Sequence, residues 1–308
     1  MLRSKTVGQD MGGYANIFST YSNMSWGGVI KSTPEVGFAL LNKLVSVFTS
    51  DFQWMTVITA LMTVIPVWLV YRKEVIDSYL SIAIYIILPT FVMPFSGLRQ
   101  SIAISLGVIA YVFTKKKKLV PFLLTVVFAC LFHQSAFLLF VMYPLYRVKI
   151  TKKWLFAIVP AMITVFIFNK PIFSFLQSLL SDVYNTKAQS TSAYSMLILF
   201  VIFCVFAFVI PDDKRVDAET NGLRNFLLFA TMIQMFAPLH TLAMRFNYYY
   251  IIFLPLLIPR IVRIRRVRYN QIAILAKYIM IIFFISYFWY NVAGKNSLSI
   301  FPYQFFWE

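Results

Sequence analysis

Long hydrophobic segments alternate with short polar connections along most of the chain after residue 50. The segments lie at about 53–71, 77–95, 98–114, 119–146, 154–169, 194–211, 223–239, 246–260 and 271–291. A helix needs roughly 20 largely apolar residues to cross the hydrocarbon core of a bilayer. Hydrophobic residues make up 60% of the chain and charged residues 13%, against about 45–50% and about 25% in soluble domains. The pattern therefore predicts an all-α, polytopic helical integral membrane protein.

Basic residues gather in the connections between these segments. Four basic connections are expected on the cytoplasmic side: Arg72–Lys73, Lys115–Lys118, Arg147–Lys153 and Arg260–Arg268. Cytoplasmic loops of membrane proteins are enriched in lysine and arginine, which explains this distribution. It also accounts for the net charge of +17, so we expect no nucleic-acid partner.

The segment 119–146 lies between two basic connections that are both expected inside, so it should not cross the membrane once. An interruption at Phe132–Ser135, which contains the polar residues His133, Gln134 and Ser135, divides it into two halves. Each half of about 13 residues reaches roughly 20 Å, which is less than the ~30 Å hydrocarbon core. We therefore predict a re-entrant hairpin with His133 near its tip. About eight transmembrane spans remain.

This topology predicts three parts: an extracytoplasmic N-terminal segment at 1–50, a single polytopic transmembrane domain at 51–295 and a short C-terminal tail at 296–308. Both termini are expected outside the cytoplasm. The N-terminal segment is fairly polar and has no signal peptide before it. We expect a further helix upstream of residue 1, the alternative being that the segment is translocated with the first span.

Arg99 and His133 are polar residues within the hydrophobic part of the chain, where a charged or titratable group is costly in a membrane protein. Arg99, with Gln100 beside it, follows a helix-breaking Ser96–Gly97, and it is either an arginine that reaches the interface or a functional cation. His133 either satisfies broken helix ends or acts as a base or hydrogen-bonding group.

Two further groups of polar residues are candidates. Arg245 precedes a tyrosine cluster that includes Tyr248 and Tyr249, and the cluster is either an aromatic belt at the interface or a sugar-binding surface. An arginine can also grip phosphate oxygens two at a time. Near the N-terminus, Asp10 and Glu35 are either helix caps or site residues. Cys130 and Cys204 lie in hydrophobic segments without the spacing of a metal site.

Three parts of the sequence resemble one known family. They are RSKTVGQDMGGYANIF followed by PEVGF, SGLRQSIAISLGVIAYVFTKKKK followed by FLLTVVFACLFHQSAFLLFVMYPLY, and RFNYYYIIFLP. In this order they resemble the EpsG-type polysaccharide polymerases, a Wzy-like family, over most of residues 3–260. The resemblance implies an architecture similar to that of C-type membrane glycosyltransferases, located in the bacterial cytoplasmic membrane.

The activity implied by the resemblance is the joining of oligosaccharide repeat units carried on undecaprenyl diphosphate, for exopolysaccharide or capsule. Such an enzyme works on the extracytoplasmic face of the lipid bilayer, with a flippase and a chain-length regulator as candidate protein partners. Diphosphate is a good leaving group, so fixed cations matter more than a general acid. No phosphate-binding glycine loop, HExxH or GxSxG motif is present. We expect no metal and no cofactor.

The candidate residues then take roles. Arg99 and Arg245 are expected to clamp the diphosphate, and His133 is the candidate base, with Asp10 as the second choice. The candidate substrate-binding residues are Arg3, Glu35, Gln100, His240, Tyr248 and Tyr249. Two other functions remain open: a lipid-linked oligosaccharide flippase and a membrane O-acyltransferase. A carrier should have polar groups near the midplane that both faces can reach, whereas here they gather toward one side.

Overall fold

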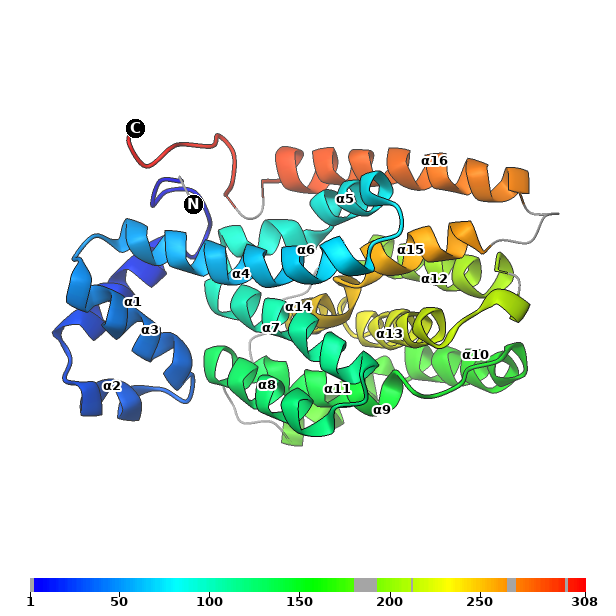
Figure 1. Cartoon of the computed structure of the whole chain (residues 1–308), viewed down its shortest axis with the longest axis horizontal. Helices are drawn as coiled ribbons and strands as arrows, with labels where there is room; N and C mark the ends of the chain where they lie inside the picture. Colours follow the sequence, from blue (N-terminus) through cyan, green and yellow to red (C-terminus); the bar gives the residue numbers. More distant parts are fainter. Residues whose placement is uncertain (1–2, 180–192, 212, 265–269, 297–298) are drawn as a thin grey trace. The chain divides into compact units, whose positions relative to one another are not determined.

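The computed structural model describes residues 3–179, 193–211, 213–264, 270–296 and 299–308, and helices dominate these parts (Figure 1). They form two compact units. The first unit is Met1–Tyr143 with Tyr278–Glu308, and the second is Pro144–Lys277. The predicted division into parts at residues 50 and 295 stays a prediction.

The first unit holds the N-terminal helices and the longest hydrophobic helices. Its elements are α1 (Met11–Asn23), α2 (Trp26–Ser32), α3 (Val36–Phe48), α4 (Phe52–Glu74), α5 (Ser78–Ile87), α6 (Pro89–Val92), η1 (Met93–Phe95), α7 (Leu98–Lys115), α8 (Leu119–Phe132), η2 (Gln134–Val141) and η6 (Phe288–Gly294). Helix α7 packs against α4 and α8, and α3 packs against α1, α2 and α8. The N-terminal segment is therefore a helical layer attached to the hydrophobic helices.

The second unit is built around α13. Its elements are α10 (Lys152–Ile167), α11 (Asn169–Leu179), α12 (Ala193–Val209), η4 (Asp213–Arg215), α13 (Ala218–Gln234), α14 (Thr241–Ile251) and α15 (Leu254–Arg263). Helix α13 packs against α12, α14 and α15. Two helices, α9 (Met142–Leu145) and α16 (Asn270–Tyr287), contain the boundaries between the units. Part of the predicted basic connection Arg260–Arg268 lies outside the described residues.

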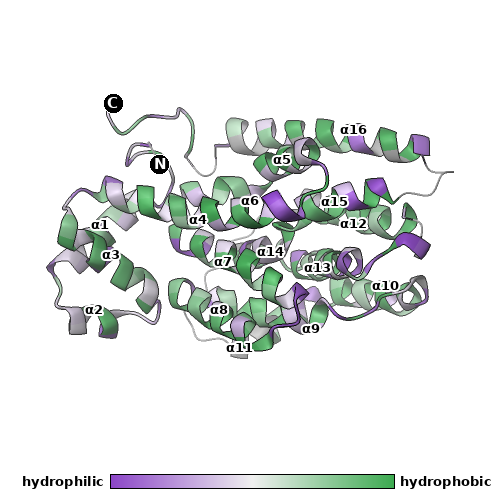
Figure 2. Cartoon of the chain, in the orientation of Figure 1, coloured by the Kyte–Doolittle hydropathy of each residue, from purple (hydrophilic) through white to green (hydrophobic). Residues whose placement is uncertain are grey.

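The outer surface of α4 is hydrophobic, as expected for a helix in a bilayer. Its large exposed side chains are Trp54, Leu61, Val64, Ile65, Trp68 and Leu69. Soluble monomers rarely expose a continuous apolar patch of this kind. In Figure 2 hydrophobic residues also extend along most of α8 and α12. The fold is therefore that of a polytopic helical membrane protein, as predicted.

Within the described residues, the helices long enough to span a membrane are fewer than the predicted segments. Phe52–Glu74 and Asn270–Tyr290 each satisfy the length and hydropathy of a span. Three bent pairs satisfy them together: Ser78–Ile87 with Pro89–Phe95 at 66°, Lys153–Ile167 with Asn169–Phe175 at 75°, and Leu242–Ile251 with Leu254–Arg263 at 50°. The predicted segments 77–95 and 246–260 thus contain bends, and the count of eight spans stays a prediction.

The predicted interruption of segment 119–146 is present. Helix α8 ends at Phe132, and His133 has an extended backbone before η2 begins. A Cβ on Gly107, near the middle of α7, would lie 2.9 Å from the side chain of Leu139 in η2. Because α8 runs from the C-terminal end of α7 back toward its start, η2 then returns along α7. The segment folds back on itself, as a hairpin does.

An apolar cluster joins the N-terminal helices to the hydrophobic helices of the first unit. Its fully or nearly fully buried members are Met11, Tyr14, Phe18, Phe38, Val45, Phe52, Met55, Leu98, Ile102 and Phe132. They come from α1, α3, α4, α7 and α8. Burying an aromatic or large aliphatic side chain contributes about 1.5–3 kcal/mol, so this cluster fixes α1 and α3 against the start of α7 and the end of α8.

The two ends of the chain pair with each other in the first unit. The Ser4 amide donates to the Gln304 carbonyl at 2.9 Å, and the Gly8 amide donates to the Ser299 carbonyl at 2.8 Å. Gly8 has a φ of 111°, which favours glycine. A Cβ there would lie 1.8 Å from the Phe95 carbonyl oxygen, so the backbone passes this point too closely for any side chain. We call this pairing of residues 3–8 with 299–305 the terminal strap.

Candidate functional site

Glu35 is the centre of a polar cluster in the first unit. One carboxylate oxygen, Oε2, accepts a charged hydrogen bond from Arg99. The other, Oε1, lies 2.6 Å from His133 Nδ1 and accepts from the Gln134 backbone amide at 3.2 Å. The Glu35 side chain is 9% exposed, against 38% for Arg99 and 28% for His133. A buried carboxylate therefore holds a more exposed cation and a more exposed imidazole.

Three helix ends bring these residues together. Glu35 immediately precedes α3, Arg99 lies in the first turn of α7, and His133 immediately follows α8. A helix N-terminus carries partial positive charge and a C-terminus partial negative charge. Glu35 and His133 are therefore at favourable ends, whereas Arg99 is at an unfavourable one. The ion pair with Glu35 offsets that cost.

The cluster keeps Glu35 ionised. Burial raises the pKa of the Glu35 carboxyl, but the hydrogen bond and charge of His133, the charge of Arg99 and the Gln134 amide together lower it below its ordinary value. The net direction is downward because three donors converge on a single carboxylate. Glu35 is therefore a carboxylate at neutral pH.

An ionised Glu35 determines which nitrogen of His133 carries a proton. A carboxylate can only accept hydrogen bonds, so Nδ1 must donate to it. In the neutral ring the other nitrogen, Nε2, then has a free lone pair. Among the described residues Nε2 has no hydrogen-bond partner. The arrangement matches that of a general base whose ring is oriented by a carboxylate.

Arg99 is fixed from two directions. Glu35 binds one of its terminal nitrogens, and the guanidinium carbon lies 5.7 Å from the centre of the Tyr14 ring. A cation over an aromatic face contributes about 0.5–1 kcal/mol at an exposed site. These contacts hold the guanidinium in one orientation, while its exposed part remains available to an anion.

Asp10 and Glu35 occupy the positions that cap α1 and α3, but neither side chain caps its helix. Asp10 instead accepts a hydrogen bond from the Ser96 hydroxyl at 3.0 Å. This bond ties α1 to the connection between η1 and α7. The capping interpretation of these two acids is therefore wrong.

Arg3 and Gln100 flank the cluster within the first unit. Both are buried. Arg3 donates to the Pro94 carbonyl at 3.0 Å and contacts the Met11 sulfur at 3.2 Å. Gln100 follows Arg99 in the first turn of α7.

The remaining candidates belong to the second unit, on α14 or at its start. His240 precedes the helix and accepts from the Leu242 amide through Nδ1 at 3.1 Å. Arg245 is exposed, whereas Tyr248 and Tyr249 are buried. The structure thus brings Arg99, His133 and Glu35 together, and the convergence of Arg245 with them stays a prediction.

Two members of the cluster were not among the candidates from sequence. The Tyr14 ring and the Gln134 backbone amide both contact it. A signal existed for Tyr14, because it lies on the same side of a helical turn as Met11 and Phe18, which are buried with it. Backbone donors leave no signal in side-chain identities. Within the part of the chain that the structure describes, no group of three or more His, Cys, Asp or Glu could hold a metal ion.

Comparison with known proteins gives one clear result. The family model of the EpsG family matches residues 1–305. No curated protein and no solved structure matches the chain. The match covers nearly the whole sequence, including both units and the terminal strap. The chain therefore belongs to the EpsG family, the family of Wzy-like polysaccharide polymerases.

Proposed function

We propose that this protein polymerises oligosaccharide repeat units carried on undecaprenyl diphosphate, at the extracytoplasmic face of the bacterial cytoplasmic membrane. Family membership supports a polysaccharide polymerase role. The observation that carries the chemistry is the Glu35 carboxylate bound to both His133 and Arg99. It combines a base and a fixed cation, which is what displacement of a diphosphate by a hydroxyl requires.

His133 acts on the acceptor hydroxyl. Its Nε2 takes the proton as the hydroxyl oxygen bonds to the anomeric carbon of the growing glycan. The bond from that carbon to the diphosphate oxygen breaks, and the electron pair leaves with the diphosphate. Glu35 keeps the ring in the correct tautomer and stabilises the imidazolium that forms. Asp10 is the second choice of base, but its carboxylate is bonded to Ser96.

Arg99 stabilises the negative charge that develops on the leaving diphosphate. Its first terminal nitrogen is bound to Glu35, so the anion meets the exposed remainder of the guanidinium. A charge-assisted hydrogen bond of this kind is roughly twice as strong as a neutral one. Arg245 supplies the second cation in this proposal, and Tyr248, Tyr249, His240 and Gln100 contribute to binding the glycan.

The test compares lipid-linked glycan in cells that carry single variants. Arg99→Lys, Arg245→Lys and His133→Ala should each lose most polymer while the protein accumulates normally in the membrane. Lysine offers a point charge and no fork, so it does not replace an arginine that binds oxygens in pairs. Arg72→Lys is the matched control, because it makes the same replacement outside the proposed site. Arg72 lies in the last turn of α4, over the Trp68 ring.

The glycan itself separates polymerase from its alternatives. Cells without the protein should accumulate single repeat units that already face outward. Loss of all outward-facing repeats would instead indicate a flippase, and polymer of normal length without acyl groups would indicate an O-acyltransferase. A normal length ladder in the Arg99→Lys variant would contradict the role given to Arg99.

A further inference from the structure

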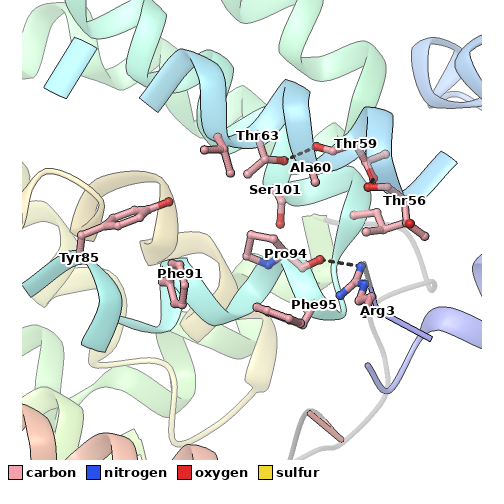
Figure 3. A pocket seen from close by; sticks show the side chains of 12 residues that line it. Arg3, Thr56, Thr59, Ala60, Thr63, Tyr85, Phe91, Pro94, Phe95 and Ser101 are labelled. Carbon is pink, nitrogen blue, oxygen red and sulfur yellow. Dashed lines mark hydrogen bonds between the residues drawn. The ribbon is translucent and has the colours of Figure 1, made fainter. Parts of the chain in front are cut away.

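A pocket of about 210 Å³ lies in the first unit beside the start of α7. It is bounded by α4, by the connection from α6 through η1, and by the first turn of α7 (Figure 3). Its apolar lining residues are Ala60, Val64, Phe91, Pro94, Phe95 and Leu98. Arg3 forms part of the wall, and among the described residues that line the pocket it is the only charged one.

Arg3 is a buried cation that binds no carboxylate among the described residues. The residue is 5% exposed, and in the described part of the chain its side-chain hydrogen bonds go to a carbonyl and to a thioether sulfur. The guanidinium also lies 5.2 Å from the centre of the Phe95 ring. Burial lowers the pKa of Arg3 to about 10, although Tyr303 and Tyr14 act in the opposite direction. Arginine is almost never buried unless it is paired, so the Arg3 guanidinium is suited to bind an anion.

Three hydroxyl groups of the pocket already donate to the backbone. Thr59 and Thr63 of α4 and Ser101 of α7 each donate to the carbonyl oxygen four residues earlier, at 2.8 Å in each case. Their hydrogens are used, so these oxygens present only lone pairs to the pocket. The Tyr85 hydroxyl is a further donor in this lining, but Arg3 carries the positive charge toward which an anionic group would turn.

The pocket also opens toward the apolar surface of the protein. Val64 lines it, and the same residue belongs to the exposed hydrophobic surface of α4. The volume is about seven times the ~30 Å³ share of a water molecule, which suits a head group and a few carbons. A longer apolar chain would continue into the bilayer past Val64.

We propose that this pocket binds the phosphate of a long-chain lipid, with the phosphate on Arg3 and the chain leaving past Val64. Joining two lipid-linked units brings two phosphate-bearing carriers together, one of which loses its glycan while the other keeps it. The Glu35–Arg99–His133 cluster serves the carrier that leaves, and the Arg3 pocket holds the carrier that is retained. This last assignment rests on the proposed function; the binding of a lipid phosphate does not.

The test measures binding to the purified full-length protein in detergent, with undecaprenyl phosphate, phosphatidylglycerol and inorganic phosphate as separate probes. Arg3→Met should weaken binding of undecaprenyl phosphate at least tenfold. The variant should fold, because replacing a buried unpaired charge by an apolar side chain is often neutral or stabilising. Lys5→Met is the matched control, because it removes an exposed basic residue two positions away, and it should change binding less than twofold.

A second variant tests the pocket without changing Arg3. Thr59→Leu fills part of the pocket that Arg3 also lines. It should weaken the binding of undecaprenyl phosphate, while the binding of inorganic phosphate stays unchanged. If the protein binds undecaprenyl phosphate more tightly than phosphatidylglycerol, the result supports the retained lipid carrier as the occupant of the pocket. Equal binding of both lipids identifies a bilayer phospholipid instead, and so overturns that assignment. Binding that is unchanged in Arg3→Met refutes the site altogether.

The outcome is independent of the polymerase proposal. If cells show a flippase or acyltransferase phenotype while Arg3→Met still loses lipid binding, the proposed function fails and the pocket stands. If the polymerase phenotype is found and Arg3→Met binds normally, the pocket fails alone.

Discussion

Glu35 positions two residues that carry the proposed chemistry, and its charge is the property on which both depend. Replacing it with glutamine keeps the shape and removes the charge. The amide no longer dictates that His133 Nδ1 carries the proton, and Arg99 loses its partner at the unfavourable end of α7. The variant would keep Arg99 and His133 but lose the ion pair of Arg99 and the fixed tautomer of His133.

We expect Glu35→Gln to lower kcat by at least about 100-fold with little change in KM, by analogy with other carboxylate–histidine pairs. Glu35→Asp should restore part of the activity, since it keeps the charge. The measurement is the rate of chain extension with purified lipid-linked repeats. Equal losses in the glutamine and aspartate variants would indicate a packing role rather than a positioning one.

The lowered pKa of Glu35 also makes stability depend on pH. Its folded-state pKa lies below the unfolded value of about 4.3. The stabilisation is therefore complete above that unfolded value and is lost as the pH falls through the folded one. At pH 7 Glu35→Gln should destabilise the protein by about 2 kcal/mol, from charged hydrogen bonds of about 1.5–3 kcal/mol each, reduced because Arg99 is partly exposed.

Thermal unfolding in detergent at pH 7 and at pH 3.5 checks this dependence. The difference between wild type and Glu35→Gln should shrink at the lower pH. A difference that stays constant between the two pH values would show that folding does not lower the pKa of the Glu35 carboxyl.

Sequence alone identified Glu35, Arg99 and His133 as candidates but not their relations. Arg99 and His133 stood out because a charged or titratable group within hydrophobic surroundings is unusual. Glu35 was a binding candidate, with a role as a cap as its alternative. Its partners lie 64 and 98 positions away in the chain, and no local pattern records a contact over such a separation.

At the scale of helices, one glycine sets how closely α3 approaches α8. A Cβ at Gly37 would lie 3.0 Å from both the Cβ and the carbonyl oxygen of Leu131. Gly37 comes two residues after Glu35, and Leu131 comes two residues before His133. The contact therefore controls the separation of the carboxylate and the imidazole.

Gly37→Ala should push α3 away from α8 by a few tenths of an ångström and reduce activity several-fold. Overpacking of this kind costs about 1–3 kcal/mol. Gly12→Ala in α1 is the matched control, because a Cβ at Gly12 would meet nothing within 4 Å. Alanine is more favourable than glycine within a helix by about 1 kcal/mol. Chain-extension rates and melting temperatures of both variants decide the matter. Equal effects at the two positions would contradict the role of this contact.

The helices themselves were predictable to different degrees. Uninterrupted segments such as α4 and α7 followed directly from hydropathy. Helices α1 to α3 have 13, 7 and 13 residues, which is too short to be stable without packing, and glycine pairs weaken α1 and α2 further. Their helical state comes from burial against the rest of the first unit. The bend before Pro89 was also missed, although a proline disfavours helix in the residue before it.

For the whole molecule, the topology prediction places Lys115–Lys118 and Arg147–Lys153 on the same, cytoplasmic side. Single cysteines in place of Lys117 and Lys152, in a background without Cys130 and Cys204, provide the measurement. Reagents that cannot cross the membrane should leave both unlabelled in intact cells, and permeant reagents should label both. Labelling of either cysteine from outside would contradict the hairpin.

The terminal strap adds a separate expectation. Hydrogen-bonded backbone segments cannot have a bilayer between them, so residues 3–8 and 299–305 must lie on the same side of the membrane. Cysteines in place of Ser4 and Gln304 should respond alike to an impermeant reagent. Labelling of one and protection of the other would show that the strap does not form in the membrane.

A strap that returns the chain to its starting side also restricts how many times the chain can cross the membrane. Between residue 8 and residue 299 the chain must cross the bilayer an even number of times, whatever the thickness of the membrane or the tilt of each helix. In the described part of the chain, the two single helices and three bent pairs give five candidate crossings, and five is odd. Either a bent pair returns to the side it came from, or a shorter helix such as Leu119–Phe132 or Tyr194–Val209 completes a crossing. Two hydrogen bonds at the ends of the chain thus limit how every helix between them can be threaded.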